Sequence, residues 1–389
     1  MVIKFKKSAV KKFRRGYPLI QEEDLLSVPQ TKEWVEFCDQ AGNYLATGYL
    51  GEQNKGIGWL INWDRQPINQ AFFATCFQVA KEKRRPYYSD EQTTAFRIFN
   101  GEGDGVGGVS IELYGEYAVF SWYNATLYHQ KEVVLAAFRE VFPEVRGAYE
   151  KIRFQATGLP ESQQIFGQAA PEPLLVLENG VQYAVYLNEG LMTGIFLDQK
   201  EVRGRLVGGL AQGKRVLNMF SYTGAFSVAA AMGGALETTS VDLAKRSLPK
   251  TREQFAVNGI DPETQKIHVM DVFNYFDYGR KKGLLFDLIV LDPPSFARNK
   301  KRVFSVHKNY GELIKDSLPI LAPNGLILAS TNAANLPVDR FQKTIEEAFQ
   351  QAGVHYHLEE TFRLPGDFVV NPAFAEGNYL KVFLYRVKQ

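Results

Sequence analysis

The sequence predicts an α/β protein in which a small β-barrel and a small α+β domain precede a C-terminal domain built on a doubly wound, mainly parallel sheet. Three observations predict this organisation. Short alternating stretches fill residues 1–70, strands and helices mix over residues 71–190, and regular strand–helix alternation begins at about residue 191. Alternation of the last kind is typical of βαβ units, which build parallel sheets. We therefore expect domains at 1–70, 71–190 and 191–389.

The first two domains are predicted from alternation and turn residues. Trp34–Asp39 and Tyr44–Tyr49 alternate apolar and polar residues around the turn Gly42-Asn43, which is typical of a hairpin. In the second domain we expect helices at 70–83 and Gln130–Val141, and strands at Val109–Leu113 and Tyr117–Tyr123. The segment Asn100-Gly-Glu-Gly-Asp-Gly105 is expected to be an irregular loop, because its glycines disfavour a regular element.

The third domain is predicted from five apolar runs, each followed by helix-like or loop sequence. The expected strands are Arg215–Phe220, Glu237–Val241, Ile267–Val269, Leu288–Leu291 and Gly325–Ser330. The fourth run leads directly into Asp292-Pro293-Pro294-Ser295-Phe296. The two prolines must end the strand ladder because neither has a backbone N–H group. The strand therefore delivers Asp292 to the carboxyl edge, where open α/β sheets bind ligands, although a plain proline-rich turn is the alternative.

Composition excludes several classes of protein. Hydrophobic residues make up 45% and charged residues 23% of the 389 residues, which is ordinary for a globular protein of two or three domains. No stretch approaches the ~18 apolar residues of a membrane span, and the basic N-terminus lacks the apolar core of a signal peptide. We expect a cytoplasmic protein without a membrane role. Cys38 and Cys76 are too few for a disulfide framework or a zinc site, so no metal is expected.

The formal charge of +2 hides an uneven distribution of basic residues. Seven lysines and arginines lie in residues 4–15, and further clusters lie at 81–85 and 298–302. Three such clusters favour a polyanionic partner. The residues that we expect to contact this partner are Lys11, Lys12, Arg14, Arg15, Arg298, Lys300, Lys301 and Arg302.

A loop typical of cofactor binding follows the first strand of the third domain. Residues 218–224 pass from the strand into a helix of small residues, where Gly224 permits the turn and free N–H groups can face a ligand. The pattern Gly-x-Gly-x-x-Gly is absent, so a pyrophosphate would be poorly held. The expected ligand contacts are Asn218, Phe220, Ser221, Tyr222, Thr223 and Gly224.

Three acidic residues lie at the ends of successive expected strands. Asp242 can accept hydrogen bonds from the two hydroxyls of a ribose. Asp271 can accept one from the exocyclic amine of adenine, and Asp292 completes the row. An adenosine cofactor without a diphosphate fits these acids, and S-adenosylmethionine (SAM) fits best.

These motifs, together with Lys11-Lys-Phe-Arg-Arg-Gly16, Asn100–Gly105 and Thr193–Lys200, carry a resemblance that covers essentially the whole chain. The chain resembles the bacterial class I methyltransferases that modify large-subunit ribosomal RNA and carry an N-terminal PUA domain. The best-known member of that group is a cytosine-C5 methyltransferase. The resemblance implies a PUA-like RNA-binding domain over residues 1–70 and a Rossmann-like class I methyltransferase domain over residues 191–389.

The resemblance also implies further site residues. Asp198, Gln199 and Lys200 would line the cofactor pocket near its methionine end, where Lys200 would pair with the carboxylate of the cofactor. An ordinary helix start is the alternative for these three residues. The implied partner is ribosomal RNA of the large subunit, and the oligomeric state is open, a homodimer included.

The sequence lacks the cysteine on which cytosine-C5 transfer depends. C5 of a pyrimidine becomes nucleophilic only after a thiolate adds to C6. In the family that the chain resembles, this cysteine follows the strand after the Asp-Pro-Pro motif, and here that place reads Ala329-Ser-Thr-Asn-Ala333. No cysteine occurs in residues 77–389, and Ser295 and Thr331 are poor substitutes because a hydroxyl without a neighbouring base forms little alkoxide.

A ring nitrogen needs no such activation. N7 of guanine carries a lone pair and can attack the methyl group directly when it is held in line. On the rigid Pro293-Pro294 support, Asp292 would accept from the Watson–Crick edge and Phe296 would stack on the base. Residues 292–302 and 330–332 also look similar to the guanine-N7 methyltransferases of large-subunit ribosomal RNA. We therefore prefer guanine N7, with cytosine C5 and the amino groups of adenine or guanine as alternatives.

Two functions outside this class remain as alternatives. One is a non-catalytic RNA-binding adaptor with a degenerate methyltransferase fold, which the intact Asp242, Asp271 and Asp292 disfavour. The other is a nicotinamide dehydrogenase, which the missing diphosphate loop disfavours. A measurement of cofactor binding would separate the enzyme from both.

Overall fold

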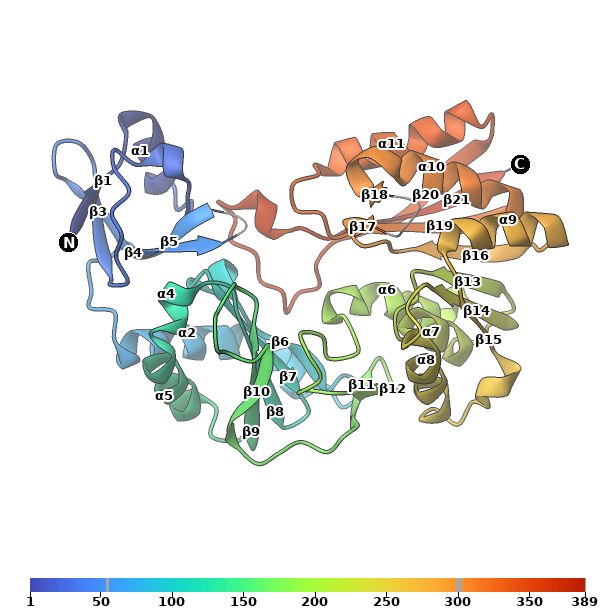
Figure 1. The fold of residues 1–389 in the computed structure, drawn as a ribbon, viewed down its shortest axis with the longest axis horizontal. Coiled ribbons are helices and arrows are strands. Elements are labelled where there is room, and N and C mark those ends of the chain that lie inside the picture. Colours follow the sequence, from blue (N-terminus) through green and yellow to red (C-terminus); the bar gives the residue numbers. More distant parts are fainter. Residues whose placement is uncertain (54–55, 299–302, 389) are drawn as a thin grey trace. The chain divides into compact units, whose positions relative to one another are not determined.

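The structure is a computed structural model that describes residues 1–53, 56–298 and 303–388. Its chain forms two compact units (Figure 1). Unit 1 comprises Met1–Val176, Val185–Thr193 and Gly366–Gly377, and unit 2 comprises Leu177–Ala184, Gly194–Pro365 and Asn378–Gln389. The expected domain boundaries at residues 70 and 190 stay predictions.

The first part of unit 1 is a five-stranded sheet with a short basic helix. Its elements are β1 (Val2–Lys4), α1 (Lys7–Arg14), β2 (Leu19–Ile20), η1 (Glu22–Asp24), β3 (Val35–Cys38), β4 (Tyr44–Gln53) and β5 (Gly56–Asn62), with the strand order β1-β3-β4-β5-β2. Phe5 stacks on Phe13 of α1 and on Phe37 of β3, with ring centroids 4.0 and 5.1 Å apart. Because α1 turns Phe13 and Ala9 inward, most of its basic residues face solvent.

The second part of unit 1 is a five-stranded sheet with helices on one face. Its elements are α2 (Gln70–Lys83), α3 (Arg85–Tyr88), β6 (Ala95–Asn100), η2 (Gly101–Asp104), β7 (Val109–Tyr114), β8 (Tyr117–Trp122), α4 (Ala125–Tyr128), α5 (Lys131–Val141), β9 (Gly147–Ile152) and β10 (Ser162–Gly167), with the strand order β10-β9-β8-β7-β6. The helices α2 and α5 meet through Phe77 and Phe138, whose ring centroids lie 5.7 Å apart. This arrangement matches the expected helices and strands of the second domain.

The glycine-rich segment after β6 differs from the expectation. It was expected to be irregular, but it contains one turn of 3-10 helix, η2. The Asp104 carboxylate fixes this turn by accepting hydrogen bonds from Asn100 N and from Arg84 Nη2, both at 2.6 Å. Gly103 is required because a Cβ atom there would lie 1.8 Å from the carbonyl oxygen of Val369. The segment therefore packs closely against Val369, a distant residue of unit 1.

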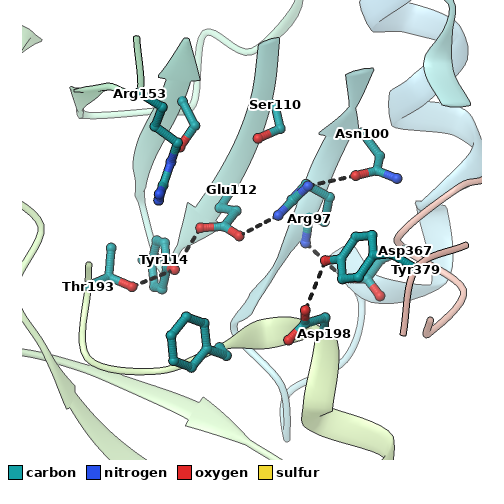
Figure 2. Close-up of polar contacts among 12 residues, drawn as sticks. Arg97, Asn100, Ser110, Glu112, Tyr114, Arg153, Thr193, Asp198, Asp367 and Tyr379 are labelled. Atoms are coloured by element: carbon teal, nitrogen blue, oxygen red, sulfur yellow. Dashed lines mark hydrogen bonds and ion pairs between the residues drawn. The ribbon is translucent and has the colours of Figure 1, made fainter. Parts of the chain in front are cut away.

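The helix-free face of the second sheet is polar and fastens another distant segment of unit 1. Glu112 accepts hydrogen bonds from Arg97 Nη2 and Tyr114 OH, both at 2.8 Å (Figure 2). The Tyr114 hydroxyl also lies 2.9 Å from Thr193 Oγ1. These contacts hold the segment Val185–Thr193 against the sheet.

Unit 2 is built on a seven-stranded sheet. Its strands are β13 (Arg215–Met219), β14 (Glu237–Asp242), β15 (Lys266–Val269), β16 (Phe286–Leu291), β19 (Leu321–Thr331), β20 (His355–Phe362) and β21 (Lys381–Lys388), in the order β15-β14-β13-β16-β19-β21-β20. The first five strands of this order are parallel to one another. β21 is antiparallel to both of its neighbours, β19 and β20, so β20 runs in the same direction as the first five strands. The doubly wound, mainly parallel sheet is therefore confirmed.

Helices connect these strands and cover both faces of the sheet. They are η3 (Leu197–Gln199), α6 (Lys200–Arg205), η4 (Leu206–Leu210), α7 (Ala225–Met232), α8 (Ser247–Ala256), η5 (Pro262–Thr264), α9 (Val272–Lys282), α10 (Val306–Ser317), η6 (Leu318–Ile320) and α11 (Val338–Gln351). Two small ladders complete the chain, β11 (Leu174–Glu178) with β12 (Val181–Val185) and β17 (Phe296–Arg298) with β18 (Val303–Ser305), and the last short helix is η7 (Ala375–Gly377).

Burial on both faces explains why the strands of unit 2 are apolar without alternation. On β16, Ile289 and Leu291 pack with α9, α10 and α11, whereas Leu288 and Val290 pack with α6 and α7 (Figure 1). Such double burial is typical of parallel strands. The same alternation sends Asp292, the next residue, to the face that α6 and α7 cover.

Candidate active site

The strand order of unit 2 marks the place of the site. The chain runs outward from β13 to β14 and β15, and then returns to the other side of β13 with β16. Connections that leave in opposite directions open a crevice outside the carboxyl ends of the strands, where ligands bind. Residues 220–224 after β13 and residues 292–296 after β16 lie at these carboxyl ends, where such a crevice is expected.

The loop after β13 has an unusual backbone. Phe220, Tyr222 and Gly224 have φ angles of 58°, 51° and 80°. A positive φ is uncommon outside glycine, and such strained conformations cluster at functional sites. At Gly224 a Cβ atom would also lie 2.5 Å from Thr251 Cγ2, so only glycine fits.

Hydrogen bonds hold this loop in place. Ser221 N donates to Val241 O of β14 at 3.0 Å. Thr223 Oγ1 donates to Gly194 O at 2.6 Å. The loop is therefore anchored both on the neighbouring strand and on the segment that leads into η3.

Two of the expected cofactor acids already accept backbone hydrogen bonds. Asp242 Oδ2 accepts from Tyr222 N at 2.9 Å, and Oδ1 accepts from Ala244 N at 2.8 Å. Each oxygen keeps a lone pair for a further donor. Asp271 caps α9 by accepting from Phe273 N at 3.0 Å, a role that Asp commonly fills. The ribose and adenine roles of these acids stay predictions.

The residues at the start of α6 lie at the same edge of unit 2. Asp198 accepts a hydrogen bond from Tyr379 OH at 2.8 Å (Figure 2). Lys200 is the first residue of α6 and is only 3% exposed. A buried ammonium requires an anionic or polar partner, so this position suits the expected pairing with a carboxylate.

Two buried side-chain oxygen atoms near these residues can accept a hydrogen bond from a ligand. Asn218 Nδ2 donates to Ser227 Oγ at 3.0 Å. Within the described part of the chain, Asn218 Oδ1 and Gln199 Oε1 are buried without a hydrogen-bond partner. An unsatisfied buried acceptor is costly unless a ligand supplies the donor. The ammonium group of an amino acid supplies several donors, so both residues fit the methionine part of SAM.

Asp292 has the most perturbed carboxyl group of the site. Gln199 Nε2 lies 3.2 Å from Asp292 Oδ1 and 2.8 Å from Ser330 Oγ. Burial, with a smaller contribution from the charge of Asp198, raises the pKa of Asp292 to about 6 against the opposing hydrogen bond from Ser330. A strongly shifted carboxyl group in a ligand crevice is a candidate functional group.

The residues after Asp292 form a rigid turn and a hairpin. Pro293 is buried and Pro294 is exposed. Ser295 Oγ donates to Asn332 Oδ1 at 2.9 Å, which links the turn to the end of β19. Phe296 begins β17 and is 62% exposed, an unusual exposure for a phenylalanine. Of the basic residues that follow, Arg298 is exposed, while the predicted RNA contacts Lys300, Lys301 and Arg302 lie outside the described residues.

The hydroxyl groups near Asp292 are not placed as nucleophiles. Ser330 and Thr331 are fully buried. Ser330 Oγ accepts from Gln199, and Thr331 Oγ1 accepts from Ala333 N at 3.2 Å. Both hydroxyls therefore serve internal hydrogen bonds.

The predicted RNA contacts on α1 divide into two groups. Lys12 pairs with Asp24 at 2.7 Å, and Arg14 pairs with Asp39 at 3.0 Å. Lys11 and Arg15 are exposed. The first pair is partly neutralised within unit 1, so Lys11 and Arg15 carry the charge that a polyanion would meet.

Sequence reasoning missed the contributions of Tyr379 and Ser227. Tyr379 reaches Asp198 from 181 residues away, and Ser227 orients Asn218 from α7. Neither residue type carries a local signal for such a contact. Ser330 and Asn332 were noted as the place of a missing cysteine and for a similarity to guanine-N7 methyltransferases, but their hydrogen bonds to Gln199 and Ser295 were not predicted.

The chain matches two family descriptions. The description "S-adenosylmethionine-dependent methyltransferase" matches residues 153–386, and "PUA-like domain" matches residues 3–63. The chain therefore belongs to the SAM-dependent methyltransferases, and SAM is its cofactor. The class I methyltransferase fold and the PUA-like N-terminal domain agree with the sequence prediction.

Particular relatives cover the whole chain. It is 48% identical, over 100% of both chains, to the "Putative ribosomal RNA large subunit methyltransferase YwbD" of Bacillus subtilis (strain 168). It is 32% identical to "Ribosomal RNA large subunit methyltransferase I" of Yersinia pestis bv. Antiqua (strain Angola), over 91% of this chain and 90% of the relative. The crystal structure of SMU.776 complexed with SAH is 48% identical and has a TM-score of 0.94, with 99% of each chain covered.

None of the helices formed by the described residues has the length and hydropathy needed to cross a bilayer. Among the same residues, no group of three His, Cys, Asp or Glu side chains is placed to hold a metal ion.

Proposed function

We propose that this enzyme transfers a methyl group from SAM to large-subunit ribosomal RNA, and that the acceptor atom is N7 of a guanine. The observation that carries the choice of atom is the setting of Asp292. It is a half-buried hydrogen-bond acceptor at the carboxyl edge of the sheet, in a unit that contains no cysteine.

Two observations support RNA as the substrate. Relatives that match this chain over nine-tenths or more of its length carry the name of ribosomal RNA large subunit methyltransferases. The PUA-like part exposes Lys11 of α1 and Arg15, which directly follows α1, and phosphate contacts of this kind supply most of the affinity for a nucleic acid. Ribosomal RNA as substrate also places the enzyme in the cytoplasm in this proposal.

The residues after β16 and β19 suit the Watson–Crick edge of a guanine. Asp292 would accept hydrogen bonds from the guanine N1–H and the 2-amino group. Because Asn332 Oδ1 accepts from Ser295, its Nδ2 group remains to donate to guanine O6. The exposed ring of Phe296 would stack on the base, as aromatic side chains do with unpaired RNA bases.

Direct attack on the methyl group then needs positioning and no covalent intermediate with the enzyme. SAM supplies an electrophilic methyl group on a sulfonium sulfur. N7 of guanine holds an available lone pair, and an aligned pair of reactants gains a large effective concentration. In this proposal, the task of the protein is to hold the base and to exclude water.

Cytosine C5 is the main alternative acceptor. It would require a nucleophile that adds to C6. Ser330 and Thr331 stand where the family's cysteine would be expected, and their hydroxyls are buried and engaged. This observation favours the ring nitrogen.

The proposal is tested by transfer from methyl-labelled SAM in vitro. The substrates are large-subunit RNA, small-subunit RNA and bulk protein from a strain that lacks the gene. We expect label in large-subunit RNA and in no other fraction, and digestion should release it as 7-methylguanosine. Label in protein or small-subunit RNA would contradict the substrate, and label in 5-methylcytidine would contradict the acceptor atom.

A further inference from the structure

Asp292 is held in place by two side chains from other elements. Gln199 Nε2 of η3 bridges Asp292 Oδ1 at 3.2 Å and Ser330 Oγ of β19 at 2.8 Å. We infer that Ser330 and Gln199 are positioning residues that keep the Asp292 carboxylate oriented and ionised for the target base. This inference rests on the proposed function, in which Asp292 receives that base.

The strand register explains why Ser330 is available for this role. β16 and β19 pair in parallel with Leu291 opposite Ala329, so Asp292 and Ser330 follow at neighbouring strand ends. Ser330 Oγ accepts from Gln199, which leaves its own hydrogen to be donated to the Asp292 carboxylate. Asp292 thus accepts hydrogen bonds from two protein side chains, Gln199 and Ser330, and does not depend on solvent for these bonds.

The backbone below this pair is also fixed. Tyr310 OH of α10 lies 2.9 Å from Leu291 O and 3.0 Å from Ser330 O, so a single hydroxyl joins the ends of both strands. Tyr310 stays neutral because burial, with the nearby charge of Asp292, raises its pKa. Ser330 therefore cannot shift without breaking a second contact.

The groups around Asp292 act on the pKa of its carboxyl group in opposite directions. Burial and, to a smaller extent, the negative charge of Asp198 raise the pKa of Asp292 to about 6. Ser330, Arg203 and Gln199 lower it. The Arg203 guanidinium is committed to the buried Glu178 carboxylate at 2.6 Å, and its contribution is fixed by that pair. Ser330 and Gln199 are the contributions that a substitution can remove, and because Gln199 Oε1 also suits the methionine part of SAM, its variant is compared at saturating SAM.

The test is the pH dependence of a single methyl transfer, with SAM and RNA saturating and RNA taken from a strain that lacks the gene. In the unchanged enzyme the rate should fall as the pH falls through about 6, because the protonated Asp292 loses an acceptor. In Ser330→Ala the acid limb, which is the low-pH part of the pH–rate profile, should move to higher pH by about one unit. A shift of this size is what the loss of one hydrogen bond to a charged group is expected to produce. Gln199→Leu should shift it in the same direction by less.

Matched variants separate this role from a general loss of stability. Ser317→Ala removes another fully buried serine hydroxyl, which donates to Ile314 O at 2.7 Å on α10, and should leave the acid limb unchanged. Ser330→Thr keeps the hydroxyl and should keep the acid limb of the unchanged enzyme. A melting curve and a SAM titration confirm that each variant is folded. If Ser330→Ala does not fold, Gln199→Leu carries the same test.

The outcomes distinguish this inference from the proposed function. Suppose that Asp292→Ala is inactive but that the pH–rate profiles of Ser330→Ala and Gln199→Leu coincide with that of the unchanged enzyme at low pH. This result would overturn the inference and leave the proposed function intact. Full turnover by Asp292→Ala would remove Asp292 from the proposed function itself. A shifted limb in both variants, with Ser317→Ala unshifted, supports the inference.

Discussion

Replacement of Asp242 by alanine should weaken SAM binding while unit 2 stays folded. Each carboxylate oxygen of Asp242 accepts one backbone hydrogen bond, Oδ2 from Tyr222 N at 2.9 Å and Oδ1 from Ala244 N at 2.8 Å. Each oxygen keeps a lone pair, which suits the two hydroxyls of a ribose. The substitution therefore removes the ribose contacts and loosens the cofactor loop.

The size of the effect follows from these contacts. A hydrogen bond to a charged group contributes about 1.5–3 kcal/mol, so two of them contribute about 3–6 kcal/mol if they are additive. Each 1.4 kcal/mol changes Kd about tenfold, which gives a range of about 10²–10⁴. Neighbouring contacts are seldom additive, so we expect the lower part of this range, about 100- to 1,000-fold. Asp242→Asn keeps one acceptor oxygen and should lose about tenfold.

Isothermal titration calorimetry with SAM measures this effect, and thermal melting reports folding. Asp261→Ala is the matched control, since Asp261 also accepts a backbone hydrogen bond, from Glu263 N at 3.0 Å, but precedes β15. It therefore lies away from the carboxyl edge and should bind SAM normally. Unchanged SAM affinity in a folded Asp242→Ala protein would refute the ribose assignment.

Three further predictions test other parts of the account. Asp292→Ala should bind SAM normally in calorimetry but transfer methyl groups to RNA more than about 100-fold more slowly, the usual cost of losing one positioned polar group. The double substitution of Lys11 and Arg15 by alanine should weaken RNA binding in a salt titration and reduce the slope of log K against log salt by about 2. Gly103→Ala should destabilise unit 1 by about 1–3 kcal/mol in chemical denaturation, since its Cβ would meet Val369 O at 1.8 Å, whereas Gly208→Ala has no atom within 4 Å and should have little effect.

Each of these predictions has an outcome that contradicts it. Normal transfer by Asp292→Ala would show that the acid does not hold the target base. An unchanged salt slope would place the phosphate contacts away from α1. A Gly103→Ala protein of unchanged stability would mean that Gly103 does not pack closely against Val369 in solution.

The sheet of unit 2 could be predicted because its signals are local. Leu288–Leu291 is apolar without alternation because both faces of β16 are buried, and prolines end the strand. The acids at strand ends could likewise be placed at one edge, since parallel strands present their carboxyl ends together. β20 and β21 were not predicted. β20 alternates exposed and half-buried residues at the edge of the sheet, a weaker signal than a continuous apolar run.

The side-chain contacts of the site could not be predicted in the same way. The Tyr379–Asp198 hydrogen bond joins residues 181 positions apart, and only the finished fold brings them together. Gly103 was predicted to be part of an irregular loop, although its role depends on a carbonyl oxygen more than 250 residues further along the chain. Asp271 was chosen for adenine, and its capping of α9 depends on where that helix begins.

The measurement that tests the central claim most directly is nucleoside mass spectrometry of large-subunit ribosomal RNA from a strain that lacks this gene. The account predicts that one 7-methylguanosine disappears, returns with the unchanged gene, and does not return with the Asp292→Ala gene. The loss of a 5-methylcytidine instead, restored by the unchanged gene, would contradict transfer to a ring nitrogen by direct attack.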